Sequence, residues 1–316
     1  MKLLLTGGSS FTGCWFARAL TEAGHQVTAT LTRPSIEAYH DGVRAQRVAD
    51  LAERCEIVTG CRFGDDRFIE VIRNGDFDVV CHHGAEATAY KSPDFDVAAA
   101  LASNTHRLRE VLATMTEAGT QRMLLTGSVF EGGEGAGSEG LPHFSPYGLG
   151  KALTAEAFAF YCRDAQIHLG KFVIPNPFGP LEEPRFTAYL MRNWFAGQTP
   201  SVNTPMYVRD NIHVDLLAQC YVRFAEGLPD EPGYCHLSPG GYIESQGAFA
   251  QRFADAMSER LELACDLELN DQVEFPEPRI RVGTDPAVAI VEDWDEQAAW
   301  DAVAKYYRAL HTAAAQ

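Results

Sequence analysis

The chain has 316 residues, of which 46% are hydrophobic and 22% are charged, and its formal net charge is −17. This composition is ordinary for a soluble protein, and the length suits one large domain or a domain with a smaller lobe. The negative charge is spread along the chain, so its average field would repel a nucleic-acid backbone or an anionic membrane surface. We therefore expect neither a nucleic acid nor a membrane as partner.

The cysteines and the apolar runs indicate the compartment. The eight cysteines are scattered, without a C-x-x-C pair or a Cys/His cluster, so we expect reduced thiols and no metal site. No apolar run approaches the roughly 20 residues that a membrane helix needs. The start of the chain turns polar at Thr6, before the core of a signal peptide could form. These features predict a cytoplasmic protein.

Short apolar runs alternate with longer amphipathic stretches through the first half of the chain. The apolar runs predict strands at residues 3–5, 27–31, 55–58, 79–81, 123–125 and 168–174. The amphipathic stretches predict helices at residues 11–23, 68–73, 97–118 and 147–163. This alternation predicts an α/β fold with a doubly wound parallel sheet that has helices on both faces.

The character of the sequence changes after residue 174. Six prolines between Pro175 and Pro205 interrupt the chain too often for the doubly wound domain to continue. We therefore predict a first domain at 1–174 and a smaller C-terminal lobe at 175–316, with a segment at about 210–240 returning to the first domain. Within this part, helices are expected at 210–226, 246–260 and 293–310, and a strand at 234–237.

A small-residue turn follows the first strand and opens the first helix. It reads Thr6-Gly7-Gly8-Ser9-Ser10-Phe11-Thr12-Gly13. Small residues at 7, 10 and 13 let the backbone turn tightly and approach a pyrophosphate, and the helix N-terminus supplies amide donors. The pattern predicts a dinucleotide site whose contacts are Gly7, Ser9, Ser10, Phe11, Thr12 and Gly13.

The end of the second strand bears on the choice of cofactor. No carboxylate stands there to hold the ribose 2′-hydroxyl of NAD, whereas Thr32 and Arg33 suit a 2′-phosphate. We therefore expect NADP as the preferred cofactor. NAD stays possible if Arg33 only caps the strand and stacks on adenine.

A phenol and an ammonium group lie one helical turn apart at Tyr147 and Lys151. The nearby cation would favour the phenolate and make the tyrosine a proton carrier at a carbinol. The hydroxyls of Thr126 and Ser128, at the end of the preceding strand, could bind the same substrate oxygen. The spacing alone occurs by chance in many helices.

Seven patches in order give the chain a resemblance to a known family. They are residues 6–13, 78–85, Ser92-Pro93 with Asn104, 126–130, 145–151, 176–180 and 209–215. Together they resemble the extended short-chain dehydrogenase/reductase family of nucleotide-sugar epimerases, dehydratases and ketoreductases, over nearly the whole length. The resemblance implies a Rossmann domain that binds NAD(P) and a lobe that binds a nucleotide-diphosphate sugar.

The resemblance also implies roles for individual residues. Tyr147 resembles the catalytic acid/base, and Lys151 resembles the residue that binds the nicotinamide ribose and favours the phenolate. Thr126 is the first choice for the catalytic hydroxyl and Ser128 the second. The cofactor contacts are extended to His82, Gly84 and Ala85. The predicted substrate contacts are Asn176, Arg185, Arg209 and Arg281; the three arginines could equally be solvated or paired charges.

The sequence departs from the family pattern in four places. Ser10 replaces the middle glycine, Val129-Phe130-Glu131 stands for V-Y-G, and Gly60-Cys61-Arg62 lacks an aspartate that often contacts adenine. His82-His83-Gly84-Ala85 replaces the commoner H-L-A-A. A histidine satisfied by backbone carbonyls is the simpler interpretation of the second imidazole. Adjacent strand residues point to opposite faces, so the two histidines cannot share a metal.

Three functions stay open at this stage. Dehydration is disfavoured because Gly127 and Ser128 occupy the places of the family's Asp-Glu pair. The missing acidic residue after the second strand gives a slight preference for an NADPH-dependent 4-keto-sugar reductase over an NAD-dependent 4-epimerase. A non-catalytic NADP-binding regulator is the third possibility. The resemblance implies a homodimer through the helices at 97–118 and 147–163, and the apolar surface of the second helix agrees with this expectation.

Overall fold

The computed structural model describes residues 1–40 and 42–314. The chain divides into two compact units, and each is described by itself. Unit 1 comprises residues 1–134, 142–174 and 218–238; unit 2 comprises residues 135–141, 175–217 and the chain from 239 onward.

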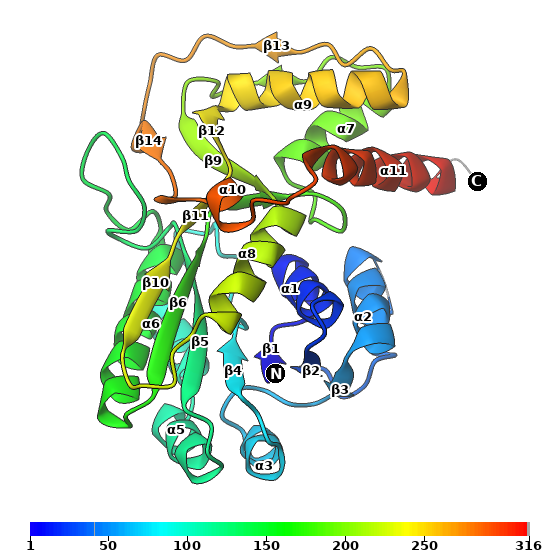
Figure 1. Ribbon diagram of the computed structural model, residues 1–316. Coiled ribbons are helices and arrows are strands. Elements are labelled where there is room, and N and C mark those ends of the chain that lie inside the picture. The colour runs from blue at the N-terminus through cyan, green and yellow to red at the C-terminus, as the bar shows by residue number, and fades with distance from the viewer. Residues whose placement is uncertain (41, 315–316) are drawn as a thin grey trace. The chain divides into compact units, whose positions relative to one another are not determined.

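A seven-stranded parallel sheet forms the centre of unit 1 (Figure 1). Its spatial order is β10-β6-β5-β4-β1-β2-β3, so the strand order reverses between β1 and β4. The strands are β1 (Lys2–Thr6), β2 (Gln26–Thr30), β3 (Glu56–Val58), β4 (Val79–His82), β5 (Arg122–Ser128), β6 (His168–Ile174) and β10 (Tyr234–Leu237). The predicted doubly wound sheet is confirmed, and ligands of such folds bind at the carboxyl ends of the strands near this reversal.

Helices cover both faces of this sheet (Figure 1). They are α1 (Phe11–Glu22), α2 (Gly42–Arg54), α3 (Asp66–Asn74), α4 (Val97–Asn104), α5 (Leu108–Glu117), α6 (Pro146–Asp164) and α8 (Val214–Glu226), whose first residues belong to unit 2. Aromatic side chains of α1 and α8 pack on one face, where Phe16 stacks on Tyr221 at 4.0 Å. Phe158 of α6 lies in the core of the other face.

The single helix predicted at 97–118 is wrong. The chain forms α4 and α5 instead, separated at Arg107, whose φ of 49° is left-handed. The break packs against Gly64, where an added Cβ would lie 1.9 Å from the carbonyl oxygen of His106. A tertiary contact therefore overrides the helical pattern of the sequence.

The helix predicted at 210–226 is also wrong in its first part. Residues Val208–His213 form strand β9, which pairs with three other strands, and helix α8 begins only at Val214. All of residues 210–213 are buried, and such a short buried run does not distinguish strand from helix by its period. The proline-rich segment moreover contains helix α7 (Phe186–Phe195), which the sequence did not indicate.

Unit 2 consists of small sheets and of helices that include α7, α9 and α11 (Figure 1). Its remaining elements are β7 (Asn176–Phe178), β8 (Ser201–Val202), β11 (Pro239–Gly240), β12 (Tyr242–Ser245), β13 (Glu268–Leu269), β14 (Ile280–Arg281), β15 (Asp285–Pro286), α9 (Gln246–Leu261), α10 (Ala287–Ile290) and α11 (Glu296–Ala314). Aromatic side chains dominate its core, with Phe178, Phe249, Phe253 and Trp300 in mutual contact.

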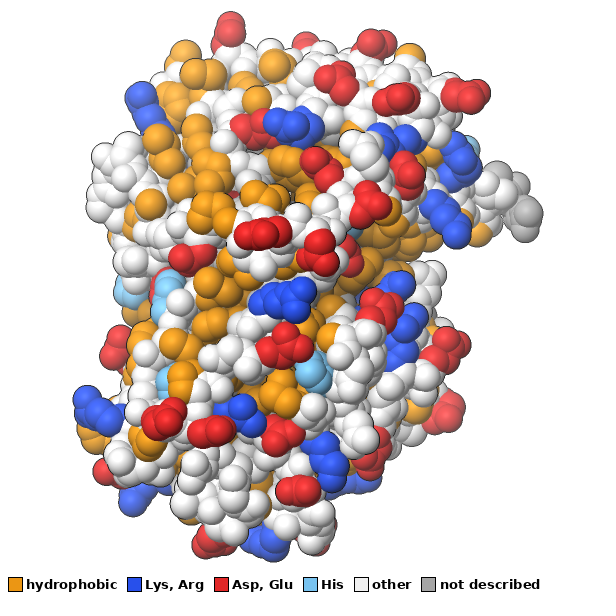
Figure 2. Space-filling model, viewed as in Figure 1, with side chains coloured by type: hydrophobic (Ala, Val, Ile, Leu, Met, Phe, Trp, Pro, Cys, Tyr) orange, Lys and Arg blue, Asp and Glu red, His pale blue; other side chains and the backbone are white. Residues whose placement is uncertain are grey.

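The distribution of charged side chains and the apolar character of the helices are relevant to nucleic acids and membranes as partners. Acidic and basic side chains are interspersed on the face shown in Figure 2. Within residues 1–40 and 42–314, no helix combines the length and the apolar character that crossing a membrane requires.

A buried carboxyl group ties three segments of unit 2 together. Glu182 is 5% exposed, and its Oε1 accepts hydrogen bonds from the hydroxyls of Thr187 on α7 and Tyr307 on α11. Burial raises the pKa of Glu182 to about 7, although the two hydroxyl donors oppose the shift.

This raised pKa predicts a pH-dependent stability. The folded protein keeps the Glu182 proton up to about pH 7, whereas the unfolded chain loses it near its ordinary pKa of 4.5. The stabilisation is therefore complete below pH 4.5 and is lost as the pH rises through 7, an effect of about 3 kcal/mol. Between pH 5 and 8, the unfolding free energy of Glu182→Gln should fall less than that of the wild type.

Urea unfolding at a series of pH values measures this difference. Glu183→Gln is the matched control because the neighbouring side chain is 41% exposed, and it should keep most of the wild-type pH dependence, since the Glu183 charge is the smallest cause of the Glu182 shift. Identical pH dependence in Glu182→Gln and the wild type would contradict the assignment.

Candidate active site

The turn after β1 requires glycine at two positions. Gly7 has a φ of 76°, and a Cβ there would lie 2.6 Å from the backbone nitrogen of Gly84. A Cβ at Gly13 would lie 2.3 Å from the carbonyl oxygen of Gly7. The turn and the end of β4 are therefore in close contact, and the backbone N–H groups at the start of α1 fit a pyrophosphate.

Ser10 fits the place of the family's middle glycine without strain. Its φ of −79° and ψ of 167° are accessible to any residue, and it is the N-cap of α1. Its hydroxyl accepts from the Gly13 N–H at 3.1 Å and donates to the Gly7 carbonyl at 2.9 Å. Ser9, Phe11 and Thr12 complete the turn and the first residues of α1, and Phe11 and Thr12 are buried.

The two adjacent histidines point to opposite faces of the sheet, as expected. His82 is buried and stacks on Phe63, and its ring nitrogens bond Thr6 Oγ1 at 3.0 Å and the Asn104 carbonyl at 3.1 Å. Burial and the Lys151 charge lower the pKa of His82 to about 3. His82 therefore supports the sheet edge, while Gly84 donates its N–H to Thr6 Oγ1 at 2.9 Å.

His83 lies on the other face and contacts two predicted site segments. Its Nε2 is 2.9 Å from Ser10 Oγ and 3.1 Å from Thr12 Oγ1, and its Nδ1 is 3.1 Å from Thr126 Oγ1. Burial and the Lys151 charge lower the pKa of His83 to about 3, so the ring is neutral. Its partners are hydroxyl groups, whereas the sequence suggested backbone carbonyls.

Arg33 is held by its own loop. Its guanidinium donates to the Ala38 carbonyl and lies over the ring of Tyr39 at 4.7 Å. Thr32 beside it is exposed. Some of the guanidinium donors of Arg33 that suggested a 2′-phosphate site are therefore already bonded within the protein.

Local sequence explains how α6 presents Tyr147 and Lys151. Ser145 caps the helix, its hydroxyl accepting from the Gly148 N–H at 3.3 Å, and Pro146 occupies its first turn. A Cβ at Gly148 would lie 2.0 Å from the Phe130 carbonyl oxygen, so glycine lets the helix approach the loop after β5. The ring of Tyr147 lies edge-on to Tyr90 and Phe95.

Lys151 joins α6 to the end of β5. Lys151 is 6% exposed, and its ammonium donates to the Thr126 carbonyl at 2.5 Å. Burial lowers the pKa of Lys151; the carboxylate of Glu131 opposes the shift, and the ammonium of Lys171 adds to it. The structure thus brings Lys151 and the backbone of Thr126 together.

The two candidate hydroxyls differ in their surroundings. Thr126 is 3% exposed, and its hydroxyl contacts His83. Ser128 is partly buried, and its Oγ accepts from the Phe130 N–H at 3.2 Å.

A buried ion network lies beside these residues and was missed by the sequence analysis. Lys171 of β6 donates to Glu131 and Glu134 at 2.6 Å each, and Glu134 bonds His236 Nε2 at 2.8 Å. Glu131, which is 1% exposed, also accepts from the Ser128 N–H at 2.8 Å. Burial opposes the charge of Lys171, but the two carboxylates outweigh it and raise its pKa. The sequence feature that could have indicated this network is a lysine, Lys171, inside the apolar run 168–174.

The predicted substrate residues belong to unit 2 and have protein partners there. Asn176 donates its amide to the Asp210 carbonyl, Arg209 pairs with Glu277 at 2.8 Å, and Arg185 lies 3.9 Å from Glu183. Arg281 pairs in register with Arg209 and is 2% exposed. Burial and the charge of Arg209 lower the pKa of Arg281.

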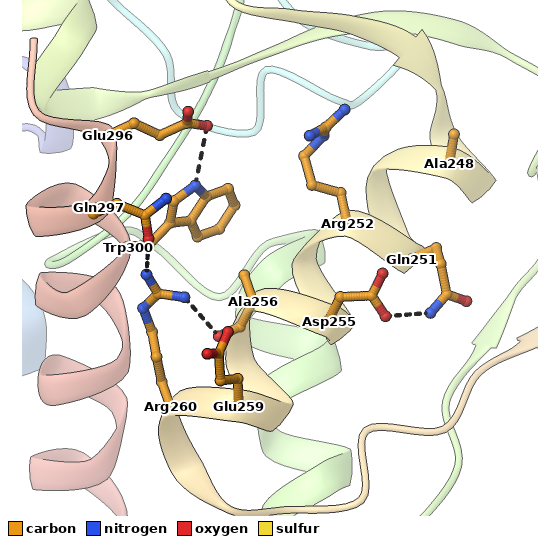
Figure 3. A pocket seen from close by; sticks show the side chains of 10 residues that line it. All are labelled: Ala248, Gln251, Arg252, Asp255, Ala256, Glu259, Arg260, Glu296, Gln297 and Trp300. Atoms are coloured by element: carbon orange, nitrogen blue, oxygen red, sulfur yellow. Dashed lines mark hydrogen bonds between the residues drawn. The ribbon is translucent and has the colours of Figure 1, made fainter.

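A groove of about 590 Å³ lies between α9 and α11, and no predicted site residue lines it. Figure 3 shows that several of its polar groups bond one another: Gln251 with Asp255, Trp300 with Glu296, and Arg260 with Gln297. Arg252 pairs with Glu244 outside the lining. The groove therefore lacks the converging donors of a ligand site. Among residues 1–40 and 42–314, no group of three or more His, Cys, Asp or Glu side chains could hold a metal ion.

A sequence profile of the NAD dependent epimerase/dehydratase family matches residues 3–233. The chain belongs to this family. The match confirms the predicted kinship with the extended short-chain dehydrogenases/reductases. No curated protein matches the sequence.

Solved structures share the fold of this family member over its full length. The UDP-glucuronic acid 4-epimerase of Bacillus cereus, solved with UDP-glucuronic acid and NAD, has a TM-score of 0.73 at 16% identity and covers 98% of this chain and 100% of its own. The UDP-glucose 4-epimerase of Stenotrophomonas maltophila, solved with NAD and formylated UDP-arabinopyranose, has a TM-score of 0.74 at 20% identity, with 99% coverage of both. The UDP-N-acetylglucosamine 4-epimerase of Methanobrevibacter ruminantium M1 has a TM-score of 0.69 at 17% identity, with 98% coverage of both.

The buried network predicts a large effect of removing its central charge. Lys171→Met leaves Glu131 and Glu134 without their shared ammonium, so unfolding should become easier by about 3–5 kcal/mol. Lys2→Met is the control, because Lys2 pairs with Asp76 at the surface and should contribute at most about 1 kcal/mol. Urea unfolding of both variants provides the comparison.

A second variant keeps this prediction testable if Lys171→Met does not fold. Glu131→Gln with Lys171→Met removes one of the two carboxylates that have lost the ammonium and should recover part of the stability. Equal stability of Lys171→Met and Lys2→Met would show that the network contributes nothing.

Proposed function

We propose that this family member is an NAD-dependent nucleotide-sugar 4-epimerase. The observation that carries the proposal is Lys151, buried one helical turn from Tyr147 and bonded to the carbonyl of Thr126. This arrangement suits proton transfer at a carbinol. The solved structures with the same fold that are named above are 4-epimerases of UDP-sugars, which favours epimerisation over our preference for ketone reduction.

The choice of NAD has two supports. Structures with the same fold contain NAD. The guanidinium of Arg33, which suggested NADP, is partly used by the Ala38 carbonyl and the Tyr39 ring. A retained NAD also suits an epimerase, which regenerates its cofactor in every turnover. We propose that the cofactor lies on the turn at residues 7–13, and that Asn176, Arg209 and Arg281 of unit 2 serve the substrate's diphosphate.

In the proposed mechanism, Tyr147 takes the proton of the sugar hydroxyl and later returns it. The ammonium of Lys151 favours the phenolate that accepts this proton. When bound, the dinucleotide supplies the hydride acceptor and donor at the sugar carbon. A hydroxyl of Thr126 or Ser128 orients the reacting oxygen. Neither Gly127 nor Ser128 can supply the second acid or base that dehydration requires.

The predicted homodimer and cytoplasmic location stay proposals. Leu153 and Phe160 of α6 are 40% and 54% exposed, which supports an apolar contact surface on this helix. Light scattering at micromolar concentration tests the dimer.

Tyr147→Phe tests the proposed chemistry. The variant should lose activity by about 10²-fold or more, because the proton carrier is gone, while the affinity for NAD stays within a few-fold of wild type. Turnover is followed by chromatography of UDP-sugar pairs, and NAD affinity by calorimetry. Tyr161→Phe on the same helix, which removes a phenol away from the helix start, is the matched control and should remain active. An active Tyr147→Phe enzyme would refute the role of the phenol.

A paired assay separates epimerisation from reduction. An epimerase converts a UDP-sugar into its 4-epimer without net change in nicotinamide absorbance, and NAD copurifies with the protein. A reductase consumes NADPH in proportion to a 4-keto-sugar nucleotide and releases the spent cofactor. Stoichiometric loss of NADPH absorbance, without isomerisation of a UDP-sugar, would replace our proposal by the reductase.

A further inference from the structure

Two departures from the family pattern touch each other in the structure. Ser10, in place of glycine, bonds the imidazole of His83, which stands in place of leucine. The same ring bonds Thr126. A leucine could make neither contact. The ring therefore connects the turn at residues 7–13 with the end of β5.

One placement of the protons uses all of these contacts. The Ser10 hydroxyl donates to the Gly7 carbonyl, so its oxygen accepts, and the Nε2 of His83 carries the proton that it receives. The Nδ1 of the neutral ring is then an acceptor, and the Thr126 hydroxyl donates to it across 3.1 Å.

Packing holds the ring in this orientation. Phe16 lies edge-on to it with 5.2 Å between ring centroids. A Cβ at Gly13 would come within 2.8 Å of its Cδ2, so glycine at this position makes room for the imidazole. The ammonium of Lys151 and burial both disfavour a charged ring, which fixes its hydrogen-bonding roles.

We infer that His83 is a positioning residue: its Nε2–H is anchored by Ser10 and its Nδ1 accepts the Thr126 hydroxyl, which fixes the direction of that hydroxyl relative to the nucleotide turn. In giving Thr126 a catalytic use, the inference rests on the proposed function. The orientation of the ring does not rest on the proposed function, because it follows from contacts that all lie within unit 1.

Two substitutions of His83 separate its contact with Ser10 from its contact with Thr126. The amide of asparagine occupies about the place of Nδ1, so His83→Asn retains a partner for Thr126 and loses the contact with Ser10. The amide of glutamine reaches about the place of Nε2, so His83→Gln retains the turn contact and loses Thr126. We expect kcat to fall about tenfold in His83→Gln and to stay within about threefold in His83→Asn, with KM for the sugar nearly unchanged in both.

A double-substitution cycle tests whether the effect passes through Thr126. Thr126→Val removes the hydroxyl, so adding His83→Gln should cost little more. Full additivity of the two losses, or wild-type kcat in His83→Gln, would overturn the inference.

Nitrogen NMR of histidine-labelled protein tests the ring without substrate or cofactor. The shifts should show a neutral His83 protonated at Nε2, with the signals assigned by their loss in His83→Asn. Thr126→Val should move the Nδ1 signal, and Ser10→Gly the Nε2 signal. A proton on Nδ1 would refute the inference. The NMR measurement tests the hydrogen bonds of His83 even if the protein turns over no sugar nucleotide. Failure of the proposed function is therefore distinguishable from failure of the inference about His83.

Discussion

The burial of two ammonium groups at one end of a parallel sheet is the constraint on which the candidate site depends. Each ammonium needs acceptors, because desolvation penalises a charge that is left alone. The ammonium of Lys171 pairs with two carboxylates, those of Glu131 and Glu134. The ammonium of Lys151 donates instead to the carbonyl of Thr126. A carbonyl satisfies one donor without neutralising the charge. The charge of Lys151 is therefore not neutralised by its bonded acceptor, as the proposed mechanism requires.

This division of roles explains the form of the loop after β5. Gly127 follows Thr126, whose carbonyl accepts from Lys151, and a Cβ at Gly127 would come within 2.8 Å of Lys171 Cε. Glu131 stands where the family pattern has glycine, and it holds both Lys171 and the Ser128 N–H. The same carboxylate thus neutralises the second lysine and fixes the backbone that presents the candidate hydroxyls.

The parts that sequence predicted are those in which residue type and spacing determine the local structure. The turn at residues 7–13 and the helix that carries Tyr147 and Lys151 follow from small residues, caps and a four-residue spacing. Partners far apart in the chain were not predictable in this way. The break at Arg107 depends on packing against Gly64, and the acceptors of Lys171 lie about forty residues upstream. The NADP prediction likewise depended on Arg33, whose partners Ala38 and Tyr39 only the folded loop reveals.

The departures from the family pattern are linked rather than independent. Ser10 is tolerated because its φ is negative, and its hydroxyl then needs partners inside the protein. His83 supplies one and offers its other nitrogen to Thr126. The glycine at 13, which the Gly7 carbonyl already requires, also leaves room for the imidazole. Changing either residue back to that of the family would remove the hydrogen bond between Ser10 and His83. The turn and the end of β5 are therefore constrained as one hydrogen-bonded unit, and substitutions there should be interpreted in pairs.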